Sequence, residues 1–93
     1  MSDYRIFETD EFTKKLGKIA RSHRTIIESK LHTYAYPQLK TAPCYGPNIK
    51  KLKGYNPETW RYRIGNYRIF YFVDESEKII YILTIDQRKD AYK

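Results

Sequence analysis

The chain has 93 residues, of which 41% are hydrophobic and 16% aromatic, and its 18 Lys and Arg against 11 Asp and Glu give a formal net charge of +7. This length excludes two domains, so we expect residues 1–93 to form a single domain. The apolar content excludes a disordered chain, and no apolar run reaches the ~20 residues of a membrane span. The lone Cys44 cannot form an intramolecular disulfide, which favours a cytoplasmic location. The basic balance points to a polyanion or an acidic protein as partner.

The first part of the chain predicts a strand followed by a helix. Residues 3–7, DYRIF, form the strand, and Thr9 or Asp10 is the expected N-cap of the helix. The apolar residues that follow the helical repeat are expected to be its buried stripe: Phe12, Leu16, Ile19 and Ala20.

A second helix is predicted after it, with Ser22 as its cap. Its buried stripe is expected at i, i+4 and i+7, in Ile27, Leu31 and Tyr34. Pro37 should end the helix, because proline disfavours helical backbone at the residue before it. The two helices together predict a helical hairpin lying on a sheet, followed by a loop over residues 37–49.

The C-terminal half predicts an antiparallel meander. After IKKLKG (49–54), three strands are expected at 59–64, 67–73 and 79–85. Gly65-Asn66 is a two-residue hairpin turn with glycine first, and 79–85 is apolar on both faces, which is typical of a central strand. The predicted fold is α+β, in two layers, with an N-terminal strand, a helical hairpin and a three-stranded antiparallel meander in the order β-α-α-β-β-β.

The turn at Gly65-Asn66 fixes the register of the hairpin, with Arg63 opposite Arg68 and Arg61 opposite Phe70. One face should pack on the helices and carries Trp60, Tyr62, Ile64, Tyr67, Ile69, Tyr71 and Val73. The other face carries Arg61, Arg63, Arg68, Phe70 and Phe72.

Like charges placed opposite one another destabilise a sheet. For Arg63 and Arg68 the repulsion is of order 1–2 kcal/mol, a sizeable part of a small domain's stability. A bound phosphate would relieve it, because guanidinium groups bind phosphate oxygens bidentately, and neighbouring aromatic rings can stack on bases. The sequence therefore predicts an RNA-binding sheet face.

Three segments together resemble the RelE/ParE superfamily of bacterial toxins: KLKG (51–54), WRYRIGNYRIFYFV (60–73) and DQRKDAY (86–92). The resemblance covers nearly the whole chain. It implies one of two activities: RelE-like members are ribosome-dependent endoribonucleases that cut mRNA in the ribosomal A site, whereas ParE-like members act on DNA gyrase and generally lack the basic catalytic set. The chain has that basic set, which favours the RelE-like branch.

The resemblance also implies site residues. The positions that match the catalytic set are Arg61, Arg63, Arg68, Arg88 and Tyr92. The expected RNA-binding residues are Lys50, Lys51, Lys53 and Phe70. The chain departs from the best-known RelE in having arginine at both 61 and 63, where that protein has lysines, and it stops one residue after Tyr92.

The chemistry expected of such a site is metal-independent attack of the 2′-OH on the adjacent phosphorus. Arg68, with Arg63 beside it, would stabilise the transition-state charge, because arginine stays protonated. Arg88 would stabilise or protonate the leaving oxygen, with Asp86 orienting Arg88. Tyr92, which can also stack on a base, is the first candidate for the general base, and Lys53 is the second.

No metal and no cofactor are expected, because the chain has no metal-ligand cluster and no P-loop. His23 and His32 fall in the predicted helical hairpin, away from the arginines. The expected partners are a cognate antitoxin, the ribosome and mRNA, with no membrane. Three hypotheses remain open: the nuclease, a gyrase-directed toxin, and a degenerate domain that only binds an antitoxin.

Overall fold

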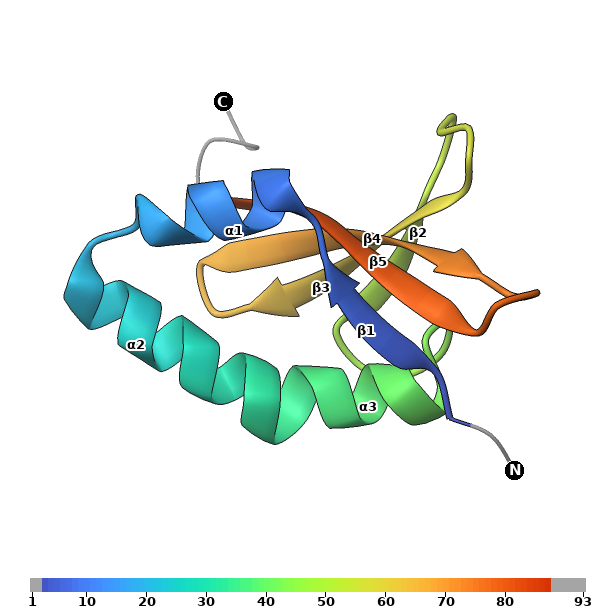
Figure 1. The fold of residues 1–93 in the computed structure, drawn as a ribbon, viewed down its shortest axis with the longest axis horizontal. Coiled ribbons are helices and arrows are strands. Elements are labelled where there is room, and N and C mark those ends of the chain that lie inside the picture. Colours follow the sequence, from blue (N-terminus) through green and yellow to red (C-terminus); the bar gives the residue numbers. More distant parts are fainter. Residues whose placement is uncertain (1–2, 88–93) are drawn as a thin grey trace.

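The computed structural model describes residues 3–87. Its elements, in chain order, are β1 (Arg5–Glu8), α1 (Asp10–Gly17), α2 (Arg21–Lys30), a π-helical turn (Leu31–Ala35), α3 (Tyr36–Thr41), β2 (Ile49–Leu52), β3 (Thr59–Ile64), β4 (Tyr67–Asp74) and β5 (Ile79–Gln87). Figure 1 shows α2, the π turn and α3 as one continuous helical run beside a twisted sheet.

The sheet has five strands in the order β1-β5-β4-β3-β2. The strand β1 pairs with β5 in parallel, and the other neighbours are antiparallel. The predicted α+β class is therefore confirmed, and β5 is a central strand as expected. The sheet is wider than the predicted meander, because residues Ile49–Leu52 pair with β3 and form the edge strand β2.

Thr9 joins three elements at the point where β1 ends and α1 begins. Its side-chain oxygen accepts a hydrogen bond from the Phe12 amide at 3.3 Å, which confirms it as the N-cap of α1. The same hydroxyl lies 2.8 Å from the carbonyl oxygen of Ile82 and 3.0 Å from that of Leu83. Thr9 therefore fixes the start of α1 against the middle of β5.

A β-bulge in β5 lies at the same place. Tyr71 pairs with Ile82 and Phe70 with Thr84, so Leu83 is an extra residue between them. A bulge shifts the alternation of side chains by one residue. As a result Tyr81, Thr84 and Asp86, which pair with Phe72, Phe70 and Arg68, all belong to the face that carries the arginines.

The second helix differs from the prediction at both ends. It begins at Arg21, its N-cap is Ala20 without a side-chain hydrogen bond, and Ser22 lies inside the first turn. At the other end Pro37 does not stop the helix, which continues to Thr41. The reason is the π turn, in which the Tyr36 amide bonds to the carbonyl of Leu31, five residues earlier. The wider turn leaves Pro37 in the first turn of α3, where proline is tolerated.

The π turn also changes which residues are buried. Leu31 and Ala35 are buried, whereas Tyr34, expected in the stripe, is 65% exposed. Ala20, expected in the stripe of the first helix, is exposed because α1 ends at Gly17. Instead, α3 contributes Tyr36 and Leu39 to the core.

The core lies between the helices and one face of the sheet. As predicted, Tyr62, Ile64, Ile69 and Tyr71 are buried there, and Trp60, Tyr67 and Val73 pack against them. From α1 and β5 come Phe12, Leu16, Ile80, Ile82 and Ile85. Burial of one such side chain contributes about 1.5–3 kcal/mol. The core therefore fixes which face of β3 and β4 remains uncovered.

Two core tyrosines hold the loop between α3 and β2. The Tyr71 hydroxyl donates to the carbonyl of Pro43, and the Tyr62 hydroxyl donates to the side-chain oxygen of Gln38 at 2.8 Å. The Gln38 amide in turn donates to the carbonyl of Pro47 at 3.0 Å. These hydrogen bonds hold the loop, and with it the start of β2, against α3 and the sheet.

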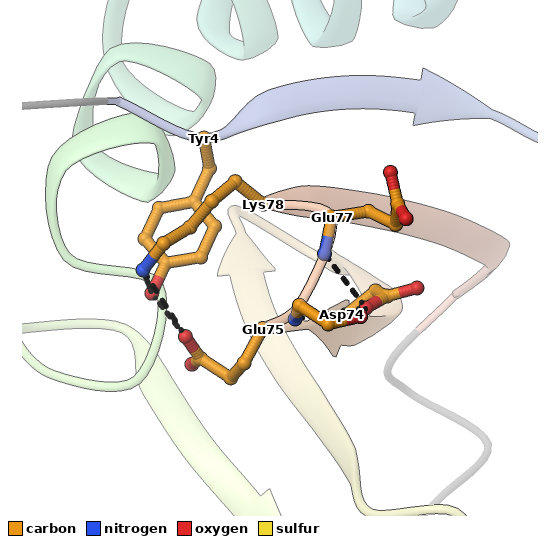
Figure 2. A network of polar contacts seen from close by, with 6 residues as sticks. Tyr4, Asp74, Glu75, Glu77 and Lys78 are labelled. Atoms are coloured by element: carbon orange, nitrogen blue, oxygen red, sulfur yellow. Dashed lines mark hydrogen bonds and ion pairs between the residues drawn. The ribbon is translucent and has the colours of Figure 1, made fainter.

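The turn between β4 and β5 is acidic and ordered by its own side chains. One Asp74 carboxylate oxygen accepts hydrogen bonds from the amides of Ser76 and Glu77 and from the Ser76 hydroxyl. The Tyr4 hydroxyl donates to Glu75 at 2.7 Å, and the Lys78 ammonium group lies over the Tyr4 ring (Figure 2). This network, which we call the acidic turn (Asp74–Lys78), attaches the start of the chain to the sheet.

Candidate nucleic-acid interface

The predicted hairpin register is confirmed in full. Arg63 pairs with Arg68, Arg61 with Phe70, Tyr62 with Ile69 and Ile64 with Tyr67. The new edge strand adds Lys50, which pairs with Arg61. We call Lys50, Arg61, Arg63 and Arg68 the basic face. It lies on the side of the sheet opposite the core.

Arg63 and Arg68 have no ion pair with any carboxylate among residues 3–87. The Arg68 guanidinium carbon lies 5.7 Å from the centre of the Phe70 ring, which is cation–π distance. Its Nε is buried and has no hydrogen-bond partner within that part of the chain. The two opposed guanidinium groups thus retain donors that an anion could use.

The three predicted RNA-binding lysines lie in different surroundings. Lys50 belongs to the basic face. Lys51 pairs with Trp60 and follows Lys50 directly on β2, so it belongs to the other face of the sheet. Its ammonium group forms an ion pair with Glu58 at 2.9 Å. Lys53 lies exposed in the turn after β2. The structure thus brings Lys50 to the arginines, but not Lys51.

Three rings form a row across β4, β5 and β1, on the side of the sheet that carries the basic face. Phe72 stacks on Tyr81 with ring centres 5.9 Å apart, and Phe7 meets Tyr81 edge-on at 5.6 Å. We call these residues the aromatic row. Along β4 the order is Arg68, Phe70, Phe72, so cations give way to rings within one strand. The sequence could not indicate Phe7 and Tyr81, because their alignment depends on the β5 bulge and on the parallel pairing of β1.

Asp86 is the carboxylate directly opposite Arg68, across β4 and β5. Its carboxylate forms no ion pair with the Arg68 guanidinium group. Its Oδ1 accepts a hydrogen bond from the ammonium group of Lys15, on α1, at 3.1 Å. Glu11 lies 3.8 Å from the same ammonium group. This contact could not be predicted from a local sequence pattern, because Lys15 and Asp86 are far apart along the chain.

Other predicted groups do not join the basic face. Arg88 and Tyr92 lie outside the described residues, and so does any contact between Asp86 and Arg88. His32 lies edge-on to Tyr36 at 5.4 Å, and His23 is exposed on α2. The Cys44 side chain is exposed, but partial desolvation, as the main cause, raises the pKa of its thiol, so the thiol is a poor nucleophile at neutral pH. Within residues 3–87, no three His, Cys, Asp or Glu side chains come together as a metal site would require.

Several solved structures with the same fold are RelE toxins, alone or in complex with an antitoxin. The RelE–RelB complex of the archaeon Pyrococcus horikoshii matches with a TM-score of 0.69 and 25% identity, over 96% of this chain and 98% of that chain. The RelBE2 toxin–antitoxin complex of Mycobacterium tuberculosis matches with a TM-score of 0.72 and 23% identity, over 92% of this chain and 99% of that chain.

In sequence, a Methanocaldococcus jannaschii protein, provisionally named toxin RelE1, is 46% identical over 46 residues, which is 50% of this chain and 50% of that protein. The match thus spans about half the length of the curated relative. The model of the family described as the ParE toxin of the type II toxin–antitoxin system parDE matches residues 6–92. The chain belongs to this family, and it is a toxin of the RelE/ParE superfamily. None of the helices in the described part of the chain is long and apolar enough to cross a membrane.

Proposed function

We propose that this toxin is a RelE-like endoribonuclease that cuts mRNA in the ribosomal A site. The observation that carries the proposal is the opposed pair Arg63 and Arg68, in which neither guanidinium group is neutralised by a carboxylate of residues 3–87. A structure under selection for stability alone would have no reason to keep this repulsion. An RNA phosphate placed between the two groups would remove it, since each can donate two hydrogen bonds to phosphate oxygens.

The reaction proposed is an attack of the 2′-OH on the adjacent phosphorus, with departure of the 5′-oxygen. Arg68 and Arg63 would stabilise the negative charge that builds up on the phosphoryl oxygens. Arg88 would stabilise or protonate the leaving oxygen. Tyr92, or in second place Lys53, would accept the proton of the 2′-OH. Positioning by the ribosome would supply much of the rate, because orientation alone can contribute several kcal/mol.

The aromatic side chains of the same face suit the bases of a single strand. Phe70 lies opposite Arg61 and two residues from Arg68 on the same face, and Phe72 continues the ring surface towards Tyr81. Stacking of a base on an aromatic ring contributes about 1–3 kcal/mol and tolerates any base. We therefore assign phosphate contacts to the basic face, with Lys50 at its edge, and base contacts to Phe70 and the aromatic row.

A cognate antitoxin is the proposed partner. The related RelE proteins of Pyrococcus horikoshii and Mycobacterium tuberculosis were solved as complexes with an antitoxin. The net charge of +7 suits a partner with an acidic segment. The antitoxin would protect the host cell when both proteins are expressed together.

The test is induction of the toxin in cells, followed by mapping of mRNA 5′ ends. Cuts confined to translated frames are expected for the wild type, and their loss is expected in Arg68→Ala. Co-purification of the variant with the antitoxin shows that it still folds. Rapid and specific cutting of naked RNA by the pure protein would contradict the dependence on the ribosome.

The alternative is a ParE-like toxin that inhibits DNA gyrase by binding to it. The observation in its favour is the family model, which is named for the ParE toxin. In this case Arg68→Ala together with Tyr92→Ala would still inhibit growth, and induced cells would show DNA damage without new mRNA ends.

A further inference from the structure

The relation between Arg68, Asp86 and Lys15 has a consequence for the proposed nuclease. Asp86 lies opposite Arg68 in adjacent antiparallel strands, where Cα atoms are about 4.5–5.5 Å apart. Opposite charges in this arrangement normally attract and pair. An aspartate can also engage a guanidinium group through two hydrogen bonds at once. By these rules, Arg68 and Asp86 should form an ion pair.

The structure has a different pairing. Asp86 binds Lys15 at 3.1 Å, and the Asp86 carboxylate forms no ion pair with the Arg68 guanidinium group. Arg68 rests instead on the Phe70 ring, 5.7 Å from its centre. The carboxylate nearest in register to the basic face is thereby engaged by a lysine from another element.

The position of Lys15 follows from the fold around Thr9. The strand β1 pairs with β5 only as far as Ile82, so the remaining part of β5 has no strand on that side. Thr9, held by the carbonyls of Ile82 and Leu83, starts α1 at this point. The helix then continues alongside the end of β5, and the second turn of α1 carries Lys15 to Asp86.

We propose that Lys15 is a positioning residue that keeps Asp86 away from Arg68, and so keeps the Arg68 guanidinium group available for an RNA phosphate. This inference rests on the proposed function, because it assumes that Arg68 binds phosphate. Without Lys15, Asp86 would turn to Arg68, occupy its donors and neutralise its charge. Lys15 itself would make no contact with the RNA.

The experiment is a double-mutant cycle with Lys15→Met and Asp86→Asn in the purified toxin, assayed on ribosomes that carry a defined mRNA. Lys15→Met should lower the cleavage rate about fivefold, the effect of ~1 kcal/mol that close surface charge pairs reach at most. Asp86→Asn removes the carboxylate that competes for Arg68, and its own cleavage rate is the reference for the double variant. The double variant should cut as fast as Asp86→Asn alone, because the carboxylate that competes for Arg68 is gone.

Lys14→Met is the matched control. It removes the same charge from the same helix, and Lys14 has no ion pair within residues 3–87. It should leave the cleavage rate unchanged. A loss in Lys14→Met equal to that in Lys15→Met would overturn the proposal. So would a double variant that is slower than Asp86→Asn by the same factor by which Lys15→Met is slower than the wild type.

A second readout does not need cleavage. Titration with inorganic phosphate, followed by NMR of the Arg68 Nε–H signal, should show weaker binding in Lys15→Met and recovery in the double variant. If the wild type does not cut mRNA but this titration gives the expected order, the proposed function fails and the role of Lys15 stands. If the wild type cuts mRNA and the Arg68 signal is the same in all variants, the role of Lys15 fails alone.

Discussion

Arg63 and Arg68 lie directly opposite one another on β3 and β4, and neither forms an ion pair with a carboxylate in the described residues. Both belong to the side of the sheet that the core leaves uncovered. The pair is thus held in place by the packing of the opposite face, through Tyr62, Ile64, Ile69 and Tyr67, and not by any attraction of its own.

The first prediction concerns the repulsion itself. Arg63→Gln should raise the free energy of unfolding by about 0.5–1 kcal/mol at low salt, because it removes one of two opposed charges. The gain should shrink at 1 M salt, where charges are screened over ~3 Å. Urea denaturation at both salt concentrations measures it. Arg21→Gln, on the exposed surface of α2, is the control and should show no such gain. An Arg63→Gln protein no more stable than the wild type at low salt would mean that the two groups do not repel.

The second prediction concerns the aromatic row. Phe72→Leu keeps an apolar side chain but removes the ring, so mRNA cleavage on the ribosome should fall about tenfold if a base stacks there. Tyr55→Leu is the control, since Tyr55 is 55% exposed and lies outside the sheet. A normal cleavage rate in Phe72→Leu with weaker antitoxin binding would instead assign the row to the antitoxin.

The third prediction concerns alkaline pH. Burial, as the main cause, raises the pKa of both Tyr36 and Tyr71 above the ordinary value near 10. A raised pKa in the folded state means that the stabilisation is complete below pH ~10 and is lost as the pH rises further, because only the unfolded chain then releases the proton. The free energy of unfolding should fall above pH 10 by about 1.4 kcal/mol per pH unit for each tyrosine.

Tyr71→Phe tests this directly in urea denaturation between pH 8 and pH 11.5. The variant loses the hydrogen bond to Pro43 and should be less stable at pH 8 by about 1 kcal/mol. Above pH 10, the free energy of unfolding of the variant should nevertheless fall less steeply with pH than that of the wild type. Tyr45→Phe, at an 81% exposed position, should keep the wild-type slope. Equal slopes in all three proteins would show that Tyr71 ionises as easily in the folded state as in the unfolded state.

The fourth prediction concerns the acidic turn. Hydrogen bonds from the Glu77 amide, in first place, and from Ser76 lower the pKa of Asp74. A lowered pKa in the folded state means that the stabilisation is present above pH ~4 and is lost as the pH falls through the folded-state value. Asp74→Ala should therefore melt at a lower temperature than the wild type at pH 7, and the difference should close in acid.

Glu77→Ala is the matched control for that variant. It removes the same charge from the same turn (Figure 2). The Glu77 side chain forms no hydrogen bond or ion pair with any described residue, so the melting temperature of the variant should stay close to that of the wild type. If both variants melt alike at pH 7, the hydrogen bonds of Asp74 do not hold the turn.

The sequence was sufficient to predict the hairpin and its arginines. A two-residue turn leaves one register, and that register with strict alternation places Arg61, Arg63 and Arg68 on one face. The helix cap at Thr9 was also predictable, because threonine followed by acidic residues is a local signal.

Other features depend on contacts that a local pattern does not contain. The edge strand Ile49–Leu52 forms because β3 is there to pair with it. The π turn adds one residue to the helix and so overrides the stop expected at Pro37. The contact of Lys15 with Asp86 needs both the parallel pairing of β1 and the bulge at Leu83. Such long-range contacts decide the part of the candidate site that the sequence missed.

The acidic turn and the basic face occupy opposite ends of β4, with Asp74 at one end and Arg68 near the other. At ~3.3 Å per residue the two are about 20 Å apart, twice the distance over which salt screens charge. One end of the strand is therefore negatively charged and the other positively charged, and neither charge cancels the other. The positive end of β4 therefore attracts an approaching polyanion towards the β3–β4 turn. The rate of productive encounters falls as ionic strength rises.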